Sequence, residues 1–123
     1  MTGDFFHHVK LDVGDLDRSL AFYTGDLRWK VIVSYDRSDG VRIVQVSPTG
    51  APPGIELWYE PPLGRSADDR LHIAIGVEDV ARAVERLRGL GVRIDREPFT
   101  IGNETIAFIR DPDGYLIELN SER

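Results

Sequence analysis

The stretch His8-Val-Lys-Leu-Asp-Val-Gly-Asp-Leu-Asp-Arg18 has a counterpart 64 residues later in His72-Ile-Ala-Ile-Gly-Val-Glu-Asp-Val-Ala-Arg82. At this offset a histidine, a valine, an aspartate and an arginine coincide, and apolar residues match elsewhere. Toward the end of each copy, Ile55-Glu56-Leu57 matches Ile117-Glu118-Leu119 at an offset of 62 residues. Because self-similarity at a fixed spacing indicates repeated structural units, the chain is predicted to hold two similar modules.

Local patterns predict the same order of elements in each module: a strand, a helix and then three strands. Strands are predicted at 6–13 and 71–77, and helices at 16–24 and 80–90, capped by Asp15 and Asp79 and ended by Gly25 and Gly91. Runs rich in β-branched and aromatic residues predict the other strands, at 29–35, 41–47, 54–59, 92–95, 104–110 and 115–120. The sequence Asp111-Pro-Asp-Gly114 is typical of a type I turn. The expected fold class is α+β, in one domain over 1–123 where a linker at 61–69 joins module one (about 5–60) to module two (about 70–122).

The composition excludes several classes of protein. A chain of 123 residues with 41% hydrophobic residues, 29% charged residues and a net charge of −6 is typical of a soluble globular domain. The absence of cysteine excludes disulfides, thiolate metal sites and cysteine nucleophiles. No apolar run reaches the roughly 18 residues of a membrane span and the start has no signal-peptide pattern, so a cytoplasmic protein without a membrane partner is expected. The acidic balance argues against nucleic acid, and the arginines at 82, 86, 88, 93 and 96 are interpreted as a solvated surface.

Strand alternation predicts the direction of four polar side chains. In the first strand, Val9 and Leu11 share the face under the helix, so His8 points to the opposite face. His7 points to the helix side or to the frayed start of the strand, and we assign it no role. The same alternation directs three further residues away from the helices: Glu56, His72 and Glu118.

These four residues have the chemistry of a metal site. A pseudo-twofold relation between the modules would bring one histidine and one glutamate from each into a single concave site. Two neutral imidazoles and two carboxylates form an N2O2 set whose charge balances a divalent ion, and the set suits Zn, Ni, Co, Fe(II) or Mn. Alternation gives the directions of these side chains and not the distances between them.

With these residues the sequence resembles the vicinal oxygen chelate superfamily, and within it glyoxalase I. The matching segments are HHVKLDVGDLDRSLAFYTGDL (7–27), GIELWY (54–59), LHIAIGVEDV (71–80) and IAFIRDPDGYLIEL (106–119). The resemblance implies the glyoxalase/bleomycin resistance/dioxygenase fold, in which two βαβββ modules form a curved mixed sheet around a cup, often across a homodimer interface. It also implies that one divalent metal ion is bound by His8, Glu56, His72 and Glu118.

Glyoxalase I isomerises the hemithioacetal of methylglyoxal and glutathione, with the metal ion stabilising an enediolate and a carboxylate moving the proton. The resemblance implies Glu118 as the principal base and Glu56 as the second. The positions at which glyoxalase I holds glutathione with Arg and Asn carry Asp12 and Glu60 here, and two carboxylates would repel that substrate. We therefore expect a metal-dependent lyase or isomerase acting on another small vicinal-oxygen substrate. Asp12, Trp58 and Glu60 are the candidates for binding it.

Three alternatives stay open. An epimerase of the same superfamily needs the same stabilised enolate and two flanking bases. A ring-cleaving dioxygenase usually employs two histidines and one glutamate on iron with further histidines nearby, and here only His7 remains. A non-catalytic antibiotic-binding protein would stack Trp58 on a flat ligand, whereas the presence of all four ligand residues favours catalysis.

Overall fold

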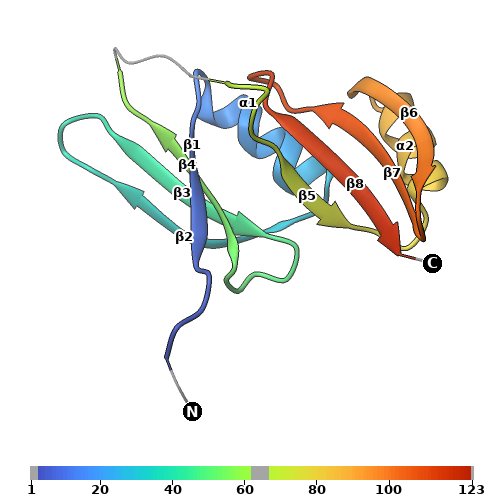
Figure 1. Cartoon of the computed structure of the whole chain (residues 1–123). Coiled ribbons are helices and arrows are strands. Elements are labelled where there is room, and N and C mark those ends of the chain that lie inside the picture. Colours follow the sequence, from blue (N-terminus) through green and yellow to red (C-terminus); the bar gives the residue numbers. More distant parts are fainter. Residues whose placement is uncertain (1–2, 62–66, 123) are drawn as a thin grey trace. The chain divides into compact units, whose positions relative to one another are not determined.

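The computed structural model describes residues 3–61 and 67–122, in which the chain forms two compact units, Met1–Ser66 and Ala67–Arg123. The boundary between the units falls within the predicted linker, of which residues 62–66 lie outside the described part. Each unit contains one four-stranded sheet and one helical segment (Figure 1).

Unit 1 follows the predicted order of strand, helix and three strands. Its elements are β1 (His8–Asp12), α1 (Leu16–Leu20), η1 (Ala21–Asp26), β2 (Lys30–Asp36), β3 (Arg42–Ser47) and β4 (Gly54–Tyr59). The sheet order is β1-β4-β3-β2, with β1 parallel to β4 and the other pairs antiparallel. The first and last strands of the module are therefore neighbours.

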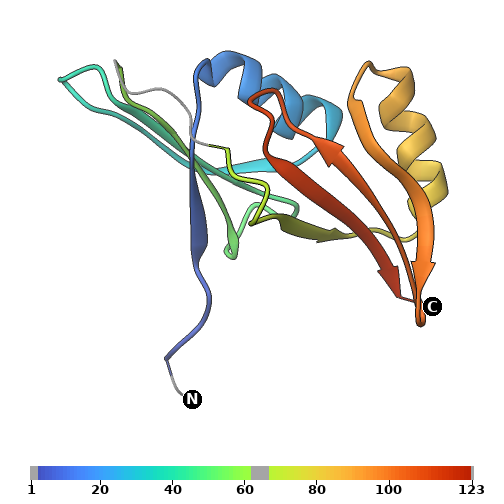
Figure 2. The ribbon, with the colours of Figure 1, turned by 45° about the horizontal axis from the view of Figure 1, so that its top comes forward.

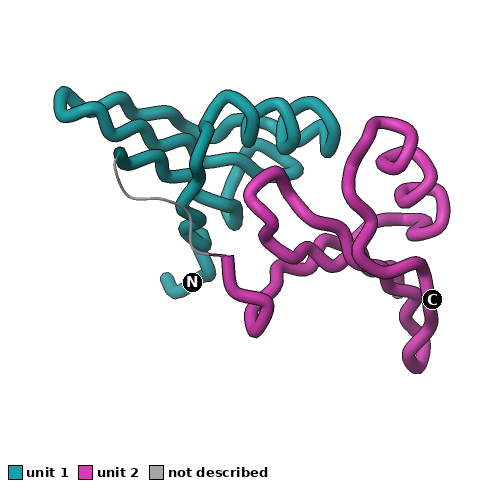
Figure 3. Tube along the Cα trace, turned by 90° about the horizontal axis from the view of Figure 1, so that it is seen from above, with its two compact units in different colours: residues 1–66 teal, residues 67–123 magenta. Residues whose placement is uncertain are grey.

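Unit 2, drawn in magenta in Figure 3, repeats this topology. Its elements are β5 (Ile73–Gly76), α2 (Val80–Gly89), β6 (Arg93–Ile101), β7 (Glu104–Arg110) and β8 (Leu116–Glu122). The sheet order is β5-β8-β7-β6, again with one parallel pair, β5 and β8. The helix α2 packs against β6, β7 and β8 (Figure 2). The predicted α+β fold with two βαβββ modules is confirmed.

The buried core of each unit includes aliphatic residues that alternate along the last strand of the module, β4 or β8. Ile55 and Leu57 of β4 and Ile117 and Leu119 of β8 are each at most 3% exposed, which agrees with the predicted strand parity. Val9 departs from that parity, because its side chain is 36% exposed although Leu11 is buried. Val9 lies on the edge strand β1, whereas the helix α1 packs against the neighbouring strand β4.

The two helices begin alike and end differently. Asp15 and Asp79 each accept a hydrogen bond from the backbone N–H three residues on, at 3.0 Å, as their predicted capping role requires. Gly91 takes the left-handed conformation with φ +89°. The predicted stop at Gly25 is wrong, because that residue lies inside η1 and Arg28 takes the left-handed conformation instead.

The wide turns of η1 explain this difference. The Leu27 N–H donates to the carbonyl of Phe22, five residues back, at 2.9 Å. This spacing adds a residue to the turn and lets the adjacent rings of Phe22 and Tyr23 both be buried, edge to face at 4.9 Å between centroids. Aromatic burial therefore decides where this helical segment ends.

The strand β6 is longer than predicted, since it spans Arg93–Ile101 and not 92–95. Its pairing with β7 shifts register between Ile94 and Arg96 and again between Arg96 and Phe99. Pro98 interrupts the strand pattern in the sequence, and an edge strand tolerates it because one side of the strand needs no ladder partner. In the part of the chain that the structure describes, no helix is long and apolar enough to cross a membrane.

Candidate functional site

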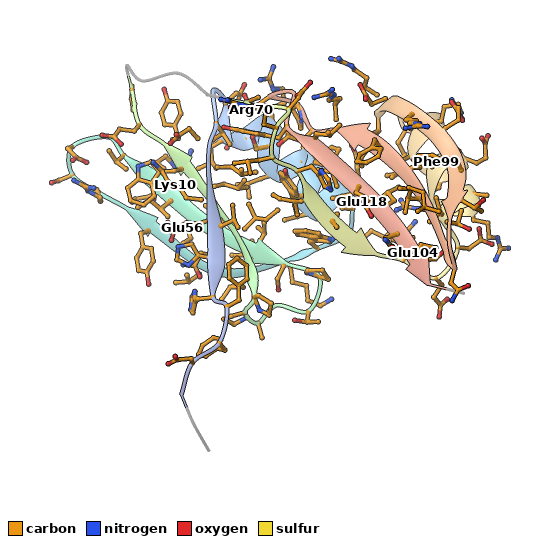
Figure 4. All side chains as sticks on the ribbon, in the orientation of Figure 1. Lys10, Glu56, Arg70, Phe99, Glu104 and Glu118 are labelled. Carbon is orange, nitrogen blue, oxygen red and sulfur yellow. The ribbon has the colours of Figure 1, made fainter. Side chains whose placement is uncertain are left out.

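The first candidate metal-ligand pair lies on the parallel strands β1 and β4. Their register pairs His8 with Gly54 and Lys10 with Glu56, so His8 and Glu56 are diagonal neighbours on one face. His8 Nε2 lies 3.5 Å from Glu56 Oε1. The His8 side chain is 32% exposed, whereas that of Glu56, labelled in Figure 4, is 11% exposed and therefore mostly buried.

Unit 2 builds the corresponding pair in the same way. His72 directly precedes β5, and Ala74 pairs with Glu118 of β8. His72 Nε2 lies 2.9 Å from Glu118 Oε1, within hydrogen-bond distance. The ring of Phe108 packs edge to face on the His72 imidazole at 5.3 Å. Each module thus places a histidine nitrogen beside a glutamate oxygen.

Gly54, which pairs with His8, lies where β4 comes close to β3. A Cβ at this position would lie 2.5 Å from the carbonyl oxygen of Val46 on β3 and 3.2 Å from Ser47 Cβ. The Gly54 N–H also donates to the carbonyl of His7 at 3.0 Å. The absence of a side chain therefore lets β4 begin close to β3 while it pairs with the start of β1.

His7 has a contact that sequence reasoning missed. Its Nδ1 lies 2.8 Å from Nδ1 of His8, and the two rings meet edge to face at 5.0 Å. The two nitrogens of an imidazole are distinct, and the partner of one determines what the other presents. His7 therefore engages Nδ1 of His8, while Nε2 is the nitrogen nearest Glu56.

Each glutamate is also held by an amide side chain that the sequence analysis did not single out. Gln45 Nε2 of β3 donates to Glu56 Oε2 at 2.8 Å. Asn120 Nδ2 donates to Glu118 Oε2 at 2.8 Å and also to Glu104 (Figure 4). The sequence offered one signal for Gln45, a polar residue among the apolar residues of the predicted strand 41–47, whereas its pairing with Glu56 is visible only in the structure.

The three predicted substrate-binding residues lie together around Lys10. The register of β1 and β4 pairs Asp12 with Trp58, and Lys10 Nζ lies 2.9 Å from Asp12 Oδ1. The same ammonium lies 4.8 Å from the centroid of the Trp58 ring, while Trp58 Nε1 donates to Glu60 Oε1 at 3.0 Å. An aromatic face between two carboxylates is suited to binding a cation.

The chemistry of the four predicted ligands fits a divalent metal ion, since imidazole nitrogen and carboxylate oxygen are ligands of Zn²⁺ and its neighbours in the first transition row. The structure places His8 beside Glu56 within unit 1 and His72 beside Glu118 within unit 2. Within residues 3–61 and 67–122, no group of three or more His, Asp or Glu side chains lies close enough to hold a metal ion. One pair supplies two ligands, so a complete set of four needs both pairs.

The duplicated βαβββ topology agrees with a comparison to known families. Residues 5–119 match the model of the Glyoxalase/Bleomycin resistance protein/Dioxygenase superfamily. The chain belongs to this superfamily. The resemblance stated from the sequence is therefore confirmed.

Relatives of this superfamily member include enzymes. The lactoylglutathione lyase of Salmonella typhimurium is 39% identical over 121 residues, which cover 91% of this chain and 88% of the relative. A trypanothione-dependent glyoxalase I of Leishmania major has a similar structure, with a TM-score of 0.84 at 38% identity over 98% of this chain and 88% of that one. TnmS3, an antibiotic-binding protein from Streptomyces sp. CB03234, has a TM-score of 0.77 at 24% identity over 100% and 99% of the two chains, which indicates a shared fold.

Proposed function

We propose that the protein is a divalent-metal-dependent enzyme of the glyoxalase I type, which moves a proton between adjacent carbons of a small vicinal-oxygen substrate. The observation that carries the proposal is the repeated pair of His8 with Glu56 and His72 with Glu118, in a chain related to lactoylglutathione lyases. The two pairs are proposed to hold one ion, within one chain or across a homodimer. When bound, the metal ion supplies Lewis-acid stabilisation of negative charge on the substrate oxygens.

Glu118 is proposed as the group that takes the proton from one carbon and returns it to the next. The Glu118 side chain is 14% exposed, and its Oε1 lies 2.9 Å from His72 Nε2. Glu56 is proposed as the second base and a metal ligand. A positioned carboxylate contributes about 10²–10⁴-fold to a proton-transfer rate. Removal of the Glu118 carboxylate should therefore lower kcat by a factor in that range.

The substrate is proposed to differ from the glutathione hemithioacetal at the end that meets Asp12 and Glu60. With Lys10 these carboxylates carry a net negative charge around the Trp58 ring at neutral pH, which disfavours a further carboxylate. The Lys10 ammonium over the Trp58 ring indicates that this cluster accommodates a positively charged group. We expect a thiol-derived or other substrate that presents an amine or a neutral group to this cluster.

Turnover of methylglyoxal with two thiols by the Ni²⁺-loaded full chain tests the reaction and the substrate together. The thiols are glutathione and glutathione amidated at its glycine carboxylate with a diamine, and the reaction in deuterated water is followed by NMR. We expect solvent deuterium in the product and at least a 10-fold higher kcat/KM for the amine-bearing thiol. Glu118→Gln should lower kcat by about 100-fold or more, while Glu85→Gln, on the exposed face of α2, should leave it unchanged.

The outcomes separate the parts of the proposal. An equal or higher kcat/KM for glutathione would overturn the substrate assignment and leave the reaction intact. Full activity of Glu118→Gln would remove that residue from the reaction. Tight binding of an aromatic ligand without any proton exchange would instead favour the non-catalytic binding protein, while exchange without a thiol would favour an epimerase.

A further inference from the structure

Each proposed carboxylate ligand has one oxygen beside a histidine and the other occupied by an amide. In unit 1 the first oxygen is Glu56 Oε1 and the amide is that of Gln45. In unit 2 the first oxygen is Glu118 Oε1 and the amide is that of Asn120. The arrangement recurs although the two amides come from different places in the module, one from the neighbouring strand and one from the same strand.

Gln45 holds its glutamate from a buried position. It is 8% exposed in the middle of β3 and directly opposite Glu56 in the antiparallel register, so the two side chains share a face. A buried amide that loses its hydrogen-bond partner pays a desolvation penalty. Movement of the Glu56 carboxylate would remove the acceptor from the Gln45 amide, and the pair is therefore held in place.

Asn120 holds its glutamate differently. It lies two residues after Glu118 on β8, on the same face of the strand, and its amide nitrogen also donates to Glu104 of β7. An amide group has two N–H donors, so one can stay with Glu104 when the other is released. A shift of the Glu118 carboxylate would therefore leave the Asn120 amide with a charged acceptor.

We propose that Gln45 and Asn120 are positioning residues, and that Glu104, by anchoring Asn120, lets Glu118 move while Glu56 stays fixed. The inference rests on the proposed function, because it assumes that both glutamates bind the ion and that Glu118 transfers the proton. It goes beyond that function by assigning roles to three residues that need not touch metal or substrate. Removal of a partner that holds a metal ligand directly, as Gln45 holds Glu56, typically changes metal affinity by about 10–100-fold.

Two measurements on the full chain test the two halves of this inference. Calorimetric titration with Ni²⁺ should give a dissociation constant about 10-fold or more higher for Gln45→Met than for the unsubstituted protein. Glu104→Ala should keep the Ni²⁺ dissociation constant and the KM while its kcat falls, because Asn120 then has no second acceptor when Glu118 moves. Asn103→Ala, in the exposed turn between β6 and β7, is the matched control and should change none of these values.

Thermal unfolding checks that each variant is folded. If Gln45→Met does not fold, Gln45→Asn replaces it, since the shorter side chain keeps a polar group but draws the amide away from Glu56. A Ni²⁺ dissociation constant within twofold of the unsubstituted value for a folded Gln45 variant overturns the role of Gln45. An unchanged kcat for Glu104→Ala overturns the role of Glu104. Absence of Ni²⁺ binding by the unsubstituted chain overturns the proposed function itself. If the unsubstituted chain binds Ni²⁺ and turns over substrate but the Gln45 and Glu104 variants behave like it, this inference alone is overturned.

Discussion

At the scale of single residues, Gly54 is a position where packing leaves little choice of side chain. Its missing side chain lets β4 approach β3, and an added Cβ would collide with a backbone oxygen, which cannot move aside as a flexible side chain can. The same residue lies opposite His8 in the parallel register. The geometry of the first His–Glu pair therefore depends on a glycine that takes no part in the chemistry.

We predict that Gly54→Ala lowers the free energy of unfolding by about 1–3 kcal/mol, the usual range for inserting a methyl group into a packed site. Gly76→Ala is the matched control, because Gly76 is also a strand glycine and an added Cβ there meets no described atom within 4 Å. Urea unfolding of the two variants measures the difference. Equal stabilities of Gly54→Ala and Gly76→Ala would show that β3 and β4 can separate at little cost.

Residue patterns singled out the four residues of the two His–Glu pairs but neither the contacts within each pair nor the groups that support them. His8, His72, Glu56 and Glu118 stand out because they recur at repeated positions with a strand parity that is easy to read. Gln45 has no repeated partner, and its importance depends on which residue lies opposite it on β4. Cross-strand register is set by turns and packing along whole strands, so a single sequence gives little information about it.

At the scale of elements, Arg110 ties together several parts of unit 2. Its Nη1 and Nη2 lie 2.5 and 3.0 Å from the two carboxylate oxygens of Asp69, and its Nε lies 3.0 Å from Asp95 Oδ1 on β6. Nη1 also donates to the carbonyl of Gly114 in the β7–β8 turn at 3.0 Å. The side chain of Arg110 is only 11% exposed, so these partners hold its charge at the junction of three segments.

This contact predicts a pH dependence of stability. The hydrogen bonds from Arg110 hold the pKa of Asp69 below its usual value, and a depressed carboxyl pKa favours the folded state only while the group is ionised. Its contribution should be present above the unfolded pKa of about 3.9 and disappear as the pH falls through the lower folded value. Asp69→Asn should therefore be less stable than the unsubstituted protein at pH 7, and the difference should be smaller at pH 2.5.

Urea unfolding at the two pH values checks this expectation. Asp39→Asn controls for the loss of an exposed aspartate–arginine pair elsewhere in the chain, because Asp39 pairs with Arg37 in an exposed turn of unit 1. The effect at Asp69 should be modest, since its side chain is 64% exposed and solvent screens the charge. A stability difference for Asp69→Asn that is the same at both pH values would show that packing, and not charge, accounts for it.

The elements themselves were largely predictable. The strands at 54–59 and 104–110 and both aspartate caps were placed correctly from alternation and capping chemistry. The errors occur where tertiary packing overrides local preference. Burial of Phe22 and Tyr23 extends the first helical segment past Gly25, and pairing with β7 carries β6 through Pro98.

At the scale of the whole molecule, the proposed ion links two units that each have their own sheet and core. A ligand that binds only the folded protein stabilises it by about 2.7 kcal/mol at 100 times its dissociation constant. We predict that Ni²⁺ at that excess raises Tm by about 10 °C, and that a chelator reverses the rise.

Substitutions in either unit should abolish this rise, because four ligands are proposed to act together. Glu56→Gln and Glu118→Gln should each lose most of the Ni²⁺-dependent increase in Tm, whereas Glu85→Gln should retain it. Differential scanning calorimetry with and without the metal gives the comparison. An increase that survives Glu56→Gln but not Glu118→Gln would mean that the ion is bound by one unit alone.

Much of the whole-molecule architecture could be inferred because duplication is visible in the sequence. The offsets of 64 and 62 residues predicted two modules of the same topology, which the two sheets confirm. A repeat pattern in the sequence predicts the fold of each copy and gives no information on how one copy is placed against the other. The joint action of the two His–Glu pairs is for that reason a proposal with its own experiment.

The register shifts in β2 and β6 have a consequence for behaviour at high concentration. Each strand ends its sheet, and each has an irregularity in its pairing, between Val31 and Val33 in β2 and at two places in β6. Bulged, twisted borders are poor templates for recruiting a strand from another molecule. These two borders should therefore resist growth into amyloid-like ribbons, and straightening β6 by deleting one bulge residue should make its border prone to recruiting a strand from another molecule.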